Sequence, residues 1–269
     1  MSDIELKAWE RKTLVANLIA QTGIVLTGAI VRLTSSGLGC PTWPECVEGS
    51  IAPTSAQTES WHKYVEFGNR LLTFVLLVVA LVTIVAIVKL NKRRSQAGLA
   101  KRRSLTALAL GSLAGIFAQA ILGGITVLTG LHPLTVAAHF MLSIGLITVA
   151  QHLLTKASEP EDLPVATQVV SPIHIAMKMH VWLALLVVFI GTLVTGTGPH
   201  AGDLDAPRLD FAITTITRFH SAAVWILMIC TVVFYLSPDL RYETKHWLKI
   251  FFFLALLQGG FGYLQYFLG

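Results

Sequence analysis

The sequence predicts an all-α integral membrane protein, and three observations carry that prediction. Hydrophobic residues make up 54% of the 269-residue chain and charged residues only 13%, whereas soluble domains carry about a quarter charged residues. The apolar residues gather in long continuous runs, and cations cluster in the short segments between them, as in multi-pass proteins. This composition excludes a soluble enzyme. The net charge of +5 does not form a nucleic-acid-binding face, because the cations lie in separate clusters.

Seven apolar runs are long enough to cross ~30 Å of hydrocarbon, which takes about 20 helical residues. The first follows a charged leader and has no small-residue cleavage site after it, so we expect a retained helix and not a signal peptide. In chain order the expected spans cover residues 13–32, 64–89, 105–127, 134–154, 178–197, 214–236 and 247–267.

The distribution of Lys and Arg predicts the orientation of these spans. The 91–104 connection carries six cations, whereas the 33–61 segment carries none. Because cation-rich loops stay on the cytoplasmic side, the 33–61 segment is expected outside. We therefore expect a multi-pass protein of the cell membrane with a cytoplasmic N-terminus.

Two pairs of similar segments indicate an internal repeat. The third expected span ends in GGITVLTG and the seventh in GYLQYFLG, each with two glycines seven residues apart. The first and fifth spans end in TGAIVRLTSSG and IGTLVTGTGPH. Parallel repeats of this kind are common in membrane proteins. We expect two tandem four-helix halves, an N-terminal half over residues 1–155 and a C-terminal half over residues 156–269.

The repeat also predicts a helix beyond the last residue. In the first half, Gly130 leads through a short turn into a fourth span that carries His139, nine residues on. The second half has three spans and reaches Gly269, the counterpart of Gly130. We therefore expect an eighth helix after residue 269, with a histidine at a similar spacing.

Ionisable side chains inside apolar spans cost about 2.5–3.5 kcal/mol each, so they mark candidate functional sites. His139 and His220 lie one to two turns inside their spans at comparable depth. Helical bundles build cofactor sites from facing side chains, and neutral imidazole is a simple axial ligand for haem iron. A zinc or copper site would need more ligands at one depth. The remaining histidines near helix ends are more often hydrogen-bonded or snorkelling residues.

Two cysteines bracket the motif CPTWPEC in the expected outer loop. The two prolines and the tryptophan make this turn stiff, which keeps Cys40 and Cys46 close, and the outer face permits a disulfide. The pair is either a structural disulfide or a redox-active pair. Cys230, inside the sixth span, is interpreted as inert packing.

Several of these motifs together resemble one family. The strings TGAIVRLTSSGLGCPTWPEC, HKYVEFGNR, QAILGGITVLTGLHPLTVAAHF, RFHSAAVW and GYLQYFLG are similar to haem A synthase, the CtaA/Cox15 family. The resemblance implies eight transmembrane helices in two four-helix halves. It also implies oxidation of the C8 methyl of haem O to the formyl group of haem A by successive hydroxylations, with haem b as the redox cofactor.

The resemblance also implies roles for individual residues. His139 would be an axial ligand of substrate haem in the N-terminal half, and His220 an axial ligand of resident haem b in the C-terminal half. Glu66 matches the family's acidic residue, whereas Asn69 stands where the family usually has histidine. Either the haem on His139 has a weak or water-filled sixth position, or His62 substitutes. We favour the first, because seven helical residues span about 10.5 Å.

The chemistry that the resemblance implies assigns further side chains. Glu66 would be catalytic, because a carboxylate stabilises positive charge on the reacting carbon and takes a proton from the adding water, the expected oxygen source. Arg32, Lys63, Arg70 and Arg218, near the outer ends of helices, are candidates for haem propionates, although snorkelling to lipid headgroups explains each equally well.

Two other functions remain open on the sequence alone. A haem b electron-transfer protein would explain the histidines but leaves Glu66 and CPTWPEC without a role, and a haem or small-molecule transporter is compatible with the repeat. If the chain is a synthase, its expected partners are haem O, haem A, a haem O synthase and assembly factors of cytochrome oxidase. Membrane lipid surrounds it in every case, and no nucleic acid is expected.

Overall fold

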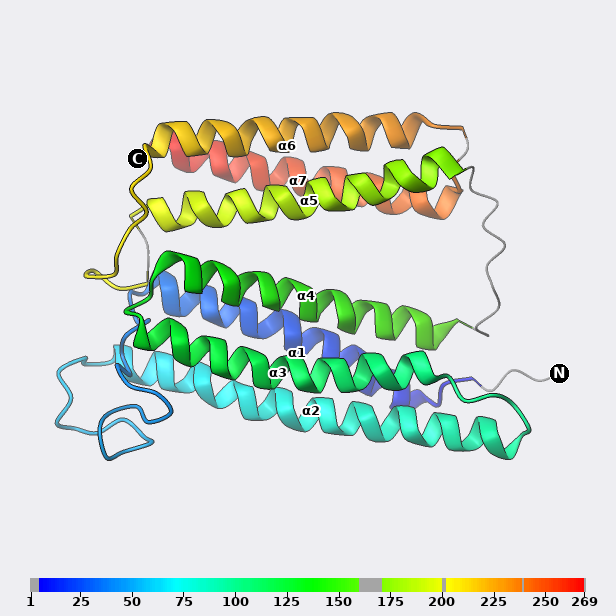
Figure 1. Ribbon diagram of the computed structural model, residues 1–269, viewed down its shortest axis with the longest axis horizontal. Coiled ribbons are helices and arrows are strands. Elements are labelled where there is room, and N and C mark those ends of the chain that lie inside the picture. The colour runs from blue at the N-terminus through cyan, green and yellow to red at the C-terminus, as the bar shows by residue number, and fades with distance from the viewer. Residues whose placement is uncertain (1–4, 160–170, 200–201, 239, 269) are drawn as a thin grey trace. The chain divides into compact units, whose positions relative to one another are not determined.

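Seven long helices account for most of the chain in the computed structural model, which describes residues 5–159, 171–199, 202–238 and 240–268 (Figure 1). In order they are α1 (Ala8–Leu33), α2 (His62–Gln96), α3 (Arg103–Leu128), α4 (Pro133–Ser158), α5 (Ser171–Thr197), α6 (Ile213–Leu236) and α7 (Tyr242–Leu268). All seven are long and apolar enough to cross a membrane, which confirms the predicted all-α membrane fold. The repeat residue Gly269 lies outside the described residues.

The first compact unit comprises residues 1–163 together with 195–210, and it contains α1 to α4. Helices α1 and α3 each pack against α2 and α4, so these four form a bundle in which α1 and α3 are diagonal. Successive helices run antiparallel, and α1 and α3 therefore point the same way (Figure 1). One aliphatic cluster, called the aliphatic plug below, fills the end of the bundle where α1 and α3 begin. It consists of Leu14, Ile87, Leu90, Leu105, Ala109, Leu153 and Ala157.

A buried ion pair closes the same end of the bundle. Glu10 on α1 is completely buried, and both of its carboxylate oxygens accept hydrogen bonds from Arg93 near the end of α2. The backbone N–H of Lys7 donates a further bond of 2.8 Å to Glu10, which completes a capping box at the start of α1. Since a buried carboxylate without a cation is strongly destabilising, this pair holds α1 and α2 in register.

The second compact unit comprises residues 164–194 and 211–269, and it contains most of α5 with all of α6 and α7. A small apolar core joins these helices. It consists of Val187 on α5 with Ala223 and Leu227 on α6, and Phe251 on α7 packs against it. The candidate residue His220 lies on α6 of this unit, against Gly191 of α5.

Candidate functional site

The loop between α1 and α2 folds back onto the end of the first bundle. The Sγ atoms of Cys40 and Cys46 are bonded, and both residues are completely buried. Gly39 lies directly on the first turn of α2, because an added Cβ would sit 2.5 Å from the carbonyl oxygen of His62. The backbone approach that brings the disulfide onto α2 therefore requires glycine at this position.

Glu66 on α2 lies directly beneath the disulfide loop. Its Oε2 accepts a 2.6 Å hydrogen bond from the backbone N–H of Cys40, and its Oε1 accepts bonds of 2.6 and 3.1 Å from Arg70. Both oxygens of the carboxylate are therefore engaged, and the residue is 5% exposed. The pairing of Glu66 and Arg70 follows from their i,i+4 spacing on α2.

Arg70 holds the loop from the same side. Its guanidinium donates to the backbone carbonyl oxygens of Cys40, Thr42 and Glu45, at 2.6 to 3.1 Å. The fork of donors on one arginine thus fixes both ends of the disulfide turn. The sequence placed Arg70 among the propionate-binding candidates, but the structure shows that its guanidinium makes five hydrogen bonds, three to the loop and two to Glu66.

Two adjacent glycines on α3 connect the loop to His139. A side chain at Gly124 would overlap the indole of Trp43, which stands between the two cysteines in sequence. At Gly123 an added Cβ would lie 3.1 Å from Cε1 of His139 on α4. The glycine pair thus lets the disulfide loop and the candidate iron ligand approach neighbouring points on α3. The GG dipeptide was visible in the sequence, but its two contacts were not.

We predict that Gly124→Val releases the disulfide loop from α3, because the branched side chain occupies the position of the Trp43 indole. Glu45, which the native loop partly shields, should then be cut by a glutamyl endopeptidase at least tenfold faster. Gly111→Val is the control on the same helix, since an added Cβ there meets nothing within 4 Å. Equal cleavage of both variants would contradict the role of Gly124.

Asn69 and His62 occupy different surroundings on α2. Asn69 Oδ1 accepts a 2.7 Å hydrogen bond from the Thr27 hydroxyl on α1. His62 Nδ1 lies 3.0 Å from the Ser36 hydroxyl, and its ring stacks on Trp61 with centroids 4.1 Å apart. His62 is therefore held by the loop two turns away from Asn69, which favours the interpretation that His62 does not replace the usual histidine.

His220 in the second unit repeats the environment of His139. It lies on α6 against Gly191 of α5, where an added Cβ would be 3.1 Å from Cε1 and 3.7 Å from Nδ1. The corresponding distances from Gly123 to His139 are also 3.1 and 3.7 Å. Nδ1 of each histidine is buried and has no hydrogen-bond partner among the described residues. Each half of the chain therefore presents one imidazole over a glycine of the neighbouring helix.

These two histidines fit the donor chemistry of a haem ligand. A buried imidazole without a protein partner costs free energy unless another group bonds it, and an axial iron–nitrogen bond satisfies one ring nitrogen. No group of three or more His, Cys, Asp or Glu side chains that could hold a metal ion occurs among the described residues. A single imidazole in each unit is the type of donor that haem iron, which brings its own equatorial ligands, takes from a protein.

The other three candidate cations differ in their exposure and in their hydrogen-bond partners. Arg32, at the end of α1, donates a 3.1 Å hydrogen bond to the carbonyl oxygen of Thr195. Arg218 on α6 is exposed. Lys63 is buried and donates to the backbone carbonyls of Thr54 and Gln57 in the loop. Of the three, Arg218 has the side chain most accessible to a propionate.

The sequence analysis did not single out His180. This residue lies on α5, with its Nε2 3.4 Å from the Thr231 hydroxyl on α6 and its ring edge-on to Phe234 and Phe251. Its Nδ1 is also without a partner in the described part of the chain. A lone histidine within an apolar span was the signal that could have identified it.

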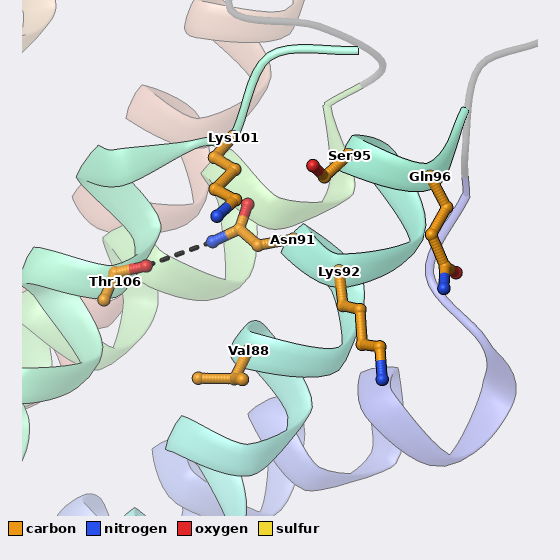
Figure 2. Close-up of a pocket in the computed structure, with 7 residues that line it drawn as sticks. All are labelled: Val88, Asn91, Lys92, Ser95, Gln96, Lys101 and Thr106. Carbon is orange, nitrogen blue, oxygen red and sulfur yellow. Dashed lines mark hydrogen bonds between the residues drawn. The ribbon is translucent and has the colours of Figure 1, made fainter. Parts of the chain in front are cut away.

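A surface pocket of about 420 Å³ lies at the opposite end of α2 from Glu66 (Figure 2). Asn91 forms its floor by donating a 3.1 Å hydrogen bond to Thr106 of α3. The pocket is lined by Val88, Asn91, Lys92, Ser95, Gln96, Lys101 and Thr106. Its lining on α2 begins at Val88, beside the aliphatic plug, so it is separate from the region of Glu66 and His139.

Comparisons with known proteins agree with the resemblance of the motifs. The chain is 30% identical to a heme A synthase of Bacillus pumilus over 181 residues, which is 65% of this chain and 54% of that protein. It is 34% identical to one of Lysinibacillus sphaericus and 29% to one of Geobacillus kaustophilus, over 52% and 53% of this chain and 41% of each relative. The chain thus spans about two fifths to half the length of these relatives. No solved structure matches.

The match to a family profile covers most of the chain. Residues 11–202 match the COX15-CtaA profile, described as cytochrome oxidase assembly protein. This range includes the disulfide loop, Glu66, Arg70 and His139. The chain therefore belongs to the COX15-CtaA family of cytochrome oxidase assembly proteins.

Proposed function

We propose that this protein is a haem A synthase, which oxidises the C8 methyl of haem O to the formyl group of haem A. The observation that carries the proposal is the family match over residues 11–202, in which the relatives are named heme A synthase. The geometry supports it, because His139 and the Glu66 loop both lie against α3 at one end of the first bundle. Water is the proposed oxygen source.

In this proposal the two halves, 1–155 and 156–269, bind different haems. His139 binds substrate haem in the first half, with Gly123 leaving room for the imidazole. His220 binds haem b in the second half. When bound there, haem b supplies one-electron redox chemistry.

Glu66 carries the proposed acid–base role next to the substrate. Its carboxylate is kept in place by Arg70 and the Cys40 N–H, and a carboxylate fixed in a low-dielectric site stabilises positive charge that develops nearby. The same group accepts a proton from the water that adds to the reacting carbon. The disulfide loop covers Glu66 and excludes bulk water from it.

The proposed setting is the cell membrane, with the N-terminus in the cytoplasm and the disulfide loop outside. The enzyme would receive haem O from a haem O synthase and deliver haem A to the assembly of cytochrome oxidase. Arg218 and Arg32 remain the proposed propionate contacts, and of these Arg218 is exposed in the structure. Arg70 is no longer proposed for this role, because its donors are bonded to Glu66 and the disulfide loop.

The proposal is tested by expressing the chain with and without a source of haem O, then extracting and separating the bound haems. A synthase yields haem A only when haem O is supplied. An extract that holds haem b alone under both conditions would instead support an electron-transfer protein. A His139→Ala variant is the matched control, because it should lower the content of haem O and haem A more than that of haem b.

We predict that replacing both Cys40 and Cys46 by serine lowers haem A formation more than it lowers folding. The buried disulfide fixes the loop over Glu66, but Arg70 and Glu66 still hold the same backbone through their own hydrogen bonds. Haem A content, compared with the yield of monodisperse protein, checks this. Cys230→Ser is the control. Full activity of the double variant would remove both the structural and the redox role of the pair.

A further inference from the structure

The pocket at the far end of α2 takes no part in the proposed haem chemistry (Figure 2). Its lining residues on one face of α2 follow Val88 by four, seven and eight positions, the spacing of side chains that share a helix face. Lys101, in the connection, and Thr106, in the first turn of α3, complete the lining. The pocket is thus formed where the end of α2 meets the start of α3.

Asn91 joins the two helices beneath this pocket. The residue is 7% exposed, and its Oδ1 accepts a 2.8 Å hydrogen bond from the backbone N–H of Arg102. Its Nδ2 donates to the Thr106 hydroxyl, which keeps its own hydrogen for another acceptor. Gly98 reverses the chain between the helices with a φ of +75°, which glycine adopts without strain. The shape of the pocket is therefore set by the protein itself.

Two lysines in the lining carry charge that the surrounding protein does not balance. Lys92 and Lys101 are exposed, and neither side chain has a hydrogen bond or an ion pair within the described ranges. No acidic residue occurs from residue 67 to residue 158, which includes most of α2 and all of α3. An anion in the pocket would meet two ammonium groups beside hydroxyl and amide donors, and bonds from charged donors are the stronger ones.

The neighbouring arginines are bonded to the protein instead. Arg93 pairs with Glu10 of α1, and Arg94 and Arg102 donate to backbone carbonyl oxygens at 2.6 to 3.0 Å. These three side chains hold the end of the bundle together, whereas the two lysines remain available to the pocket. The positive-inside rule needs only an excess of cations in this connection, so it does not account for this division.

The position of the pocket identifies the source of the anion. Val88 is near the end of the apolar span predicted over residues 64–89, and the polar lining lies beyond it, so the pocket spans the boundary between hydrocarbon and headgroups. Exposed apolar side chains continue from it toward the middle of the membrane. Val85 and Leu81 on α2 are each 47% exposed, and Leu110 on α3 is 49% exposed. This surface suits acyl chains, which a soluble phosphate compound lacks.

We propose that the pocket binds the phosphate of an anionic phospholipid, with Lys92 and Lys101 as its charge partners and the Thr106 hydroxyl as a further donor. Basic pockets between membrane helices on the cytoplasmic side bind acidic lipid headgroups, and the cations predict that side for this connection. The volume of about 420 Å³ lies within the range of small-molecule sites, ~300–1,000 Å³. The site goes beyond the proposed haem chemistry and does not depend on it.

Native mass spectrometry of the purified chain with added lipid tests the pocket. We expect phosphatidylglycerol to bind about tenfold more tightly than neutral phosphatidylcholine, because each lysine near an anionic lipid adds favourable electrostatic free energy. Replacing Lys92 and Lys101 together by glutamine should remove that preference. The matched control replaces Lys12 and Arg103 by glutamine, which removes the same charge from exposed positions outside the lining. Equal binding of the two lipids, or equal losses in both double variants, would overturn the proposal.

Glycerophosphoglycerol, the headgroup of phosphatidylglycerol without its acyl chains, separates a lipid from a soluble ligand. It should not displace the bound lipid even at roughly hundredfold excess, because it cannot bury apolar surface on Val85, Val88 and Leu110. Displacement at a concentration equal to that of the lipid would assign the pocket to a soluble phosphate compound, against the proposal.

A photoreactive phosphatidylglycerol locates the site on the unmodified protein. With a diazirine on the first carbons of an acyl chain, labelling should concentrate on Val85, Val88 and Leu110, and unlabelled phosphatidylglycerol should suppress it more than phosphatidylcholine does. Ile19 on α1 is 64% exposed and serves as the control for general lipid contact, because both lipids should suppress its labelling equally. Equal suppression by both lipids at Val85, Val88 and Leu110 as well would contradict the proposal. Neither measurement needs haem or turnover, so their failure leaves the proposed function untouched.

Discussion

Replacing His220 by alanine is expected to abolish binding of haem b in the second half of the protein. In the proposed function the imidazole is the iron ligand from α6, and its neighbours Ser221, Ala222 and Ala223 offer no nitrogen or sulfur side chain in its place. Since Gly191 already leaves space beside the ring, the alanine variant opens a cavity and does not create a clash. The Soret absorbance per protein measures the loss, which should exceed tenfold for this site.

His180→Ala is the matched control for this experiment. His180 lies in the same unit, within a membrane span, and shares with His220 a buried Nδ1 without a partner in the described chain. Because Phe234, Phe251 and Thr231 surround its ring, its loss should affect packing and leave haem b in place. An unchanged Soret band in His220→Ala, or an equal loss in both variants, would show that His220 has a structural role only.

Replacing Glu66 by glutamine is expected to reduce haem A formation by ~10²–10³-fold, the usual effect of losing one electrostatic contact to a transition state. The change keeps the shape of the side chain but removes its charge and its capacity as a base. Because both oxygens of Glu66 accept hydrogen bonds, the amide nitrogen must face either Arg70, which loses two bonds, or the Cys40 N–H, which loses one. Haem extraction after expression with haem O measures the result.

The control for this variant removes the same charge from an exposed position. Glu48→Gln lies in the same loop, and its side chain is exposed, so haem A formation should stay at the native level. The variant Glu66→Gln should also retain its Soret band and its Cys40–Cys46 disulfide, checked by mass spectrometry without reduction. Native haem A levels in Glu66→Gln would refute the acid–base role, whereas loss of haem and disulfide together would assign Glu66 to folding only.

The membrane spans could be predicted because their signal is local. An apolar run must be about 20 residues long to cross the bilayer, whatever the other helices do. The seven expected spans therefore match α1 to α7, although the helices extend past them, as α2 does to Gln96. The extra turns carry Lys, Arg and polar residues, which hydropathy assigns to the loops but which continue the helix beyond the hydrocarbon.

The candidate residues could be named from the sequence for a related reason. Ionisable groups are rare in apolar spans, so His139, His220 and Glu66 were conspicuous without any structure. His180 carries the same signal and was passed over, because no neighbouring motif supported it. The resemblance to the family supplied the roles of His139, His220 and Glu66. His180 lies in none of the motifs that carry the resemblance, so the sequence assigned it no role.

The sequence by itself therefore determined the seven spans found among the described residues, the composition of each and the short list of polar residues within them. Tertiary structure alone decided which groups meet: Glu66 with the Cys40 N–H 26 residues away, Trp43 with Gly124, and each candidate histidine with a glycine of the next helix. The thickness of the bilayer sets the length of each apolar segment independently of the others, so the spans can be predicted from the sequence. Hydrogen bonds and close packing between helices depend on rotation and depth, which are settled only when all the helices assemble.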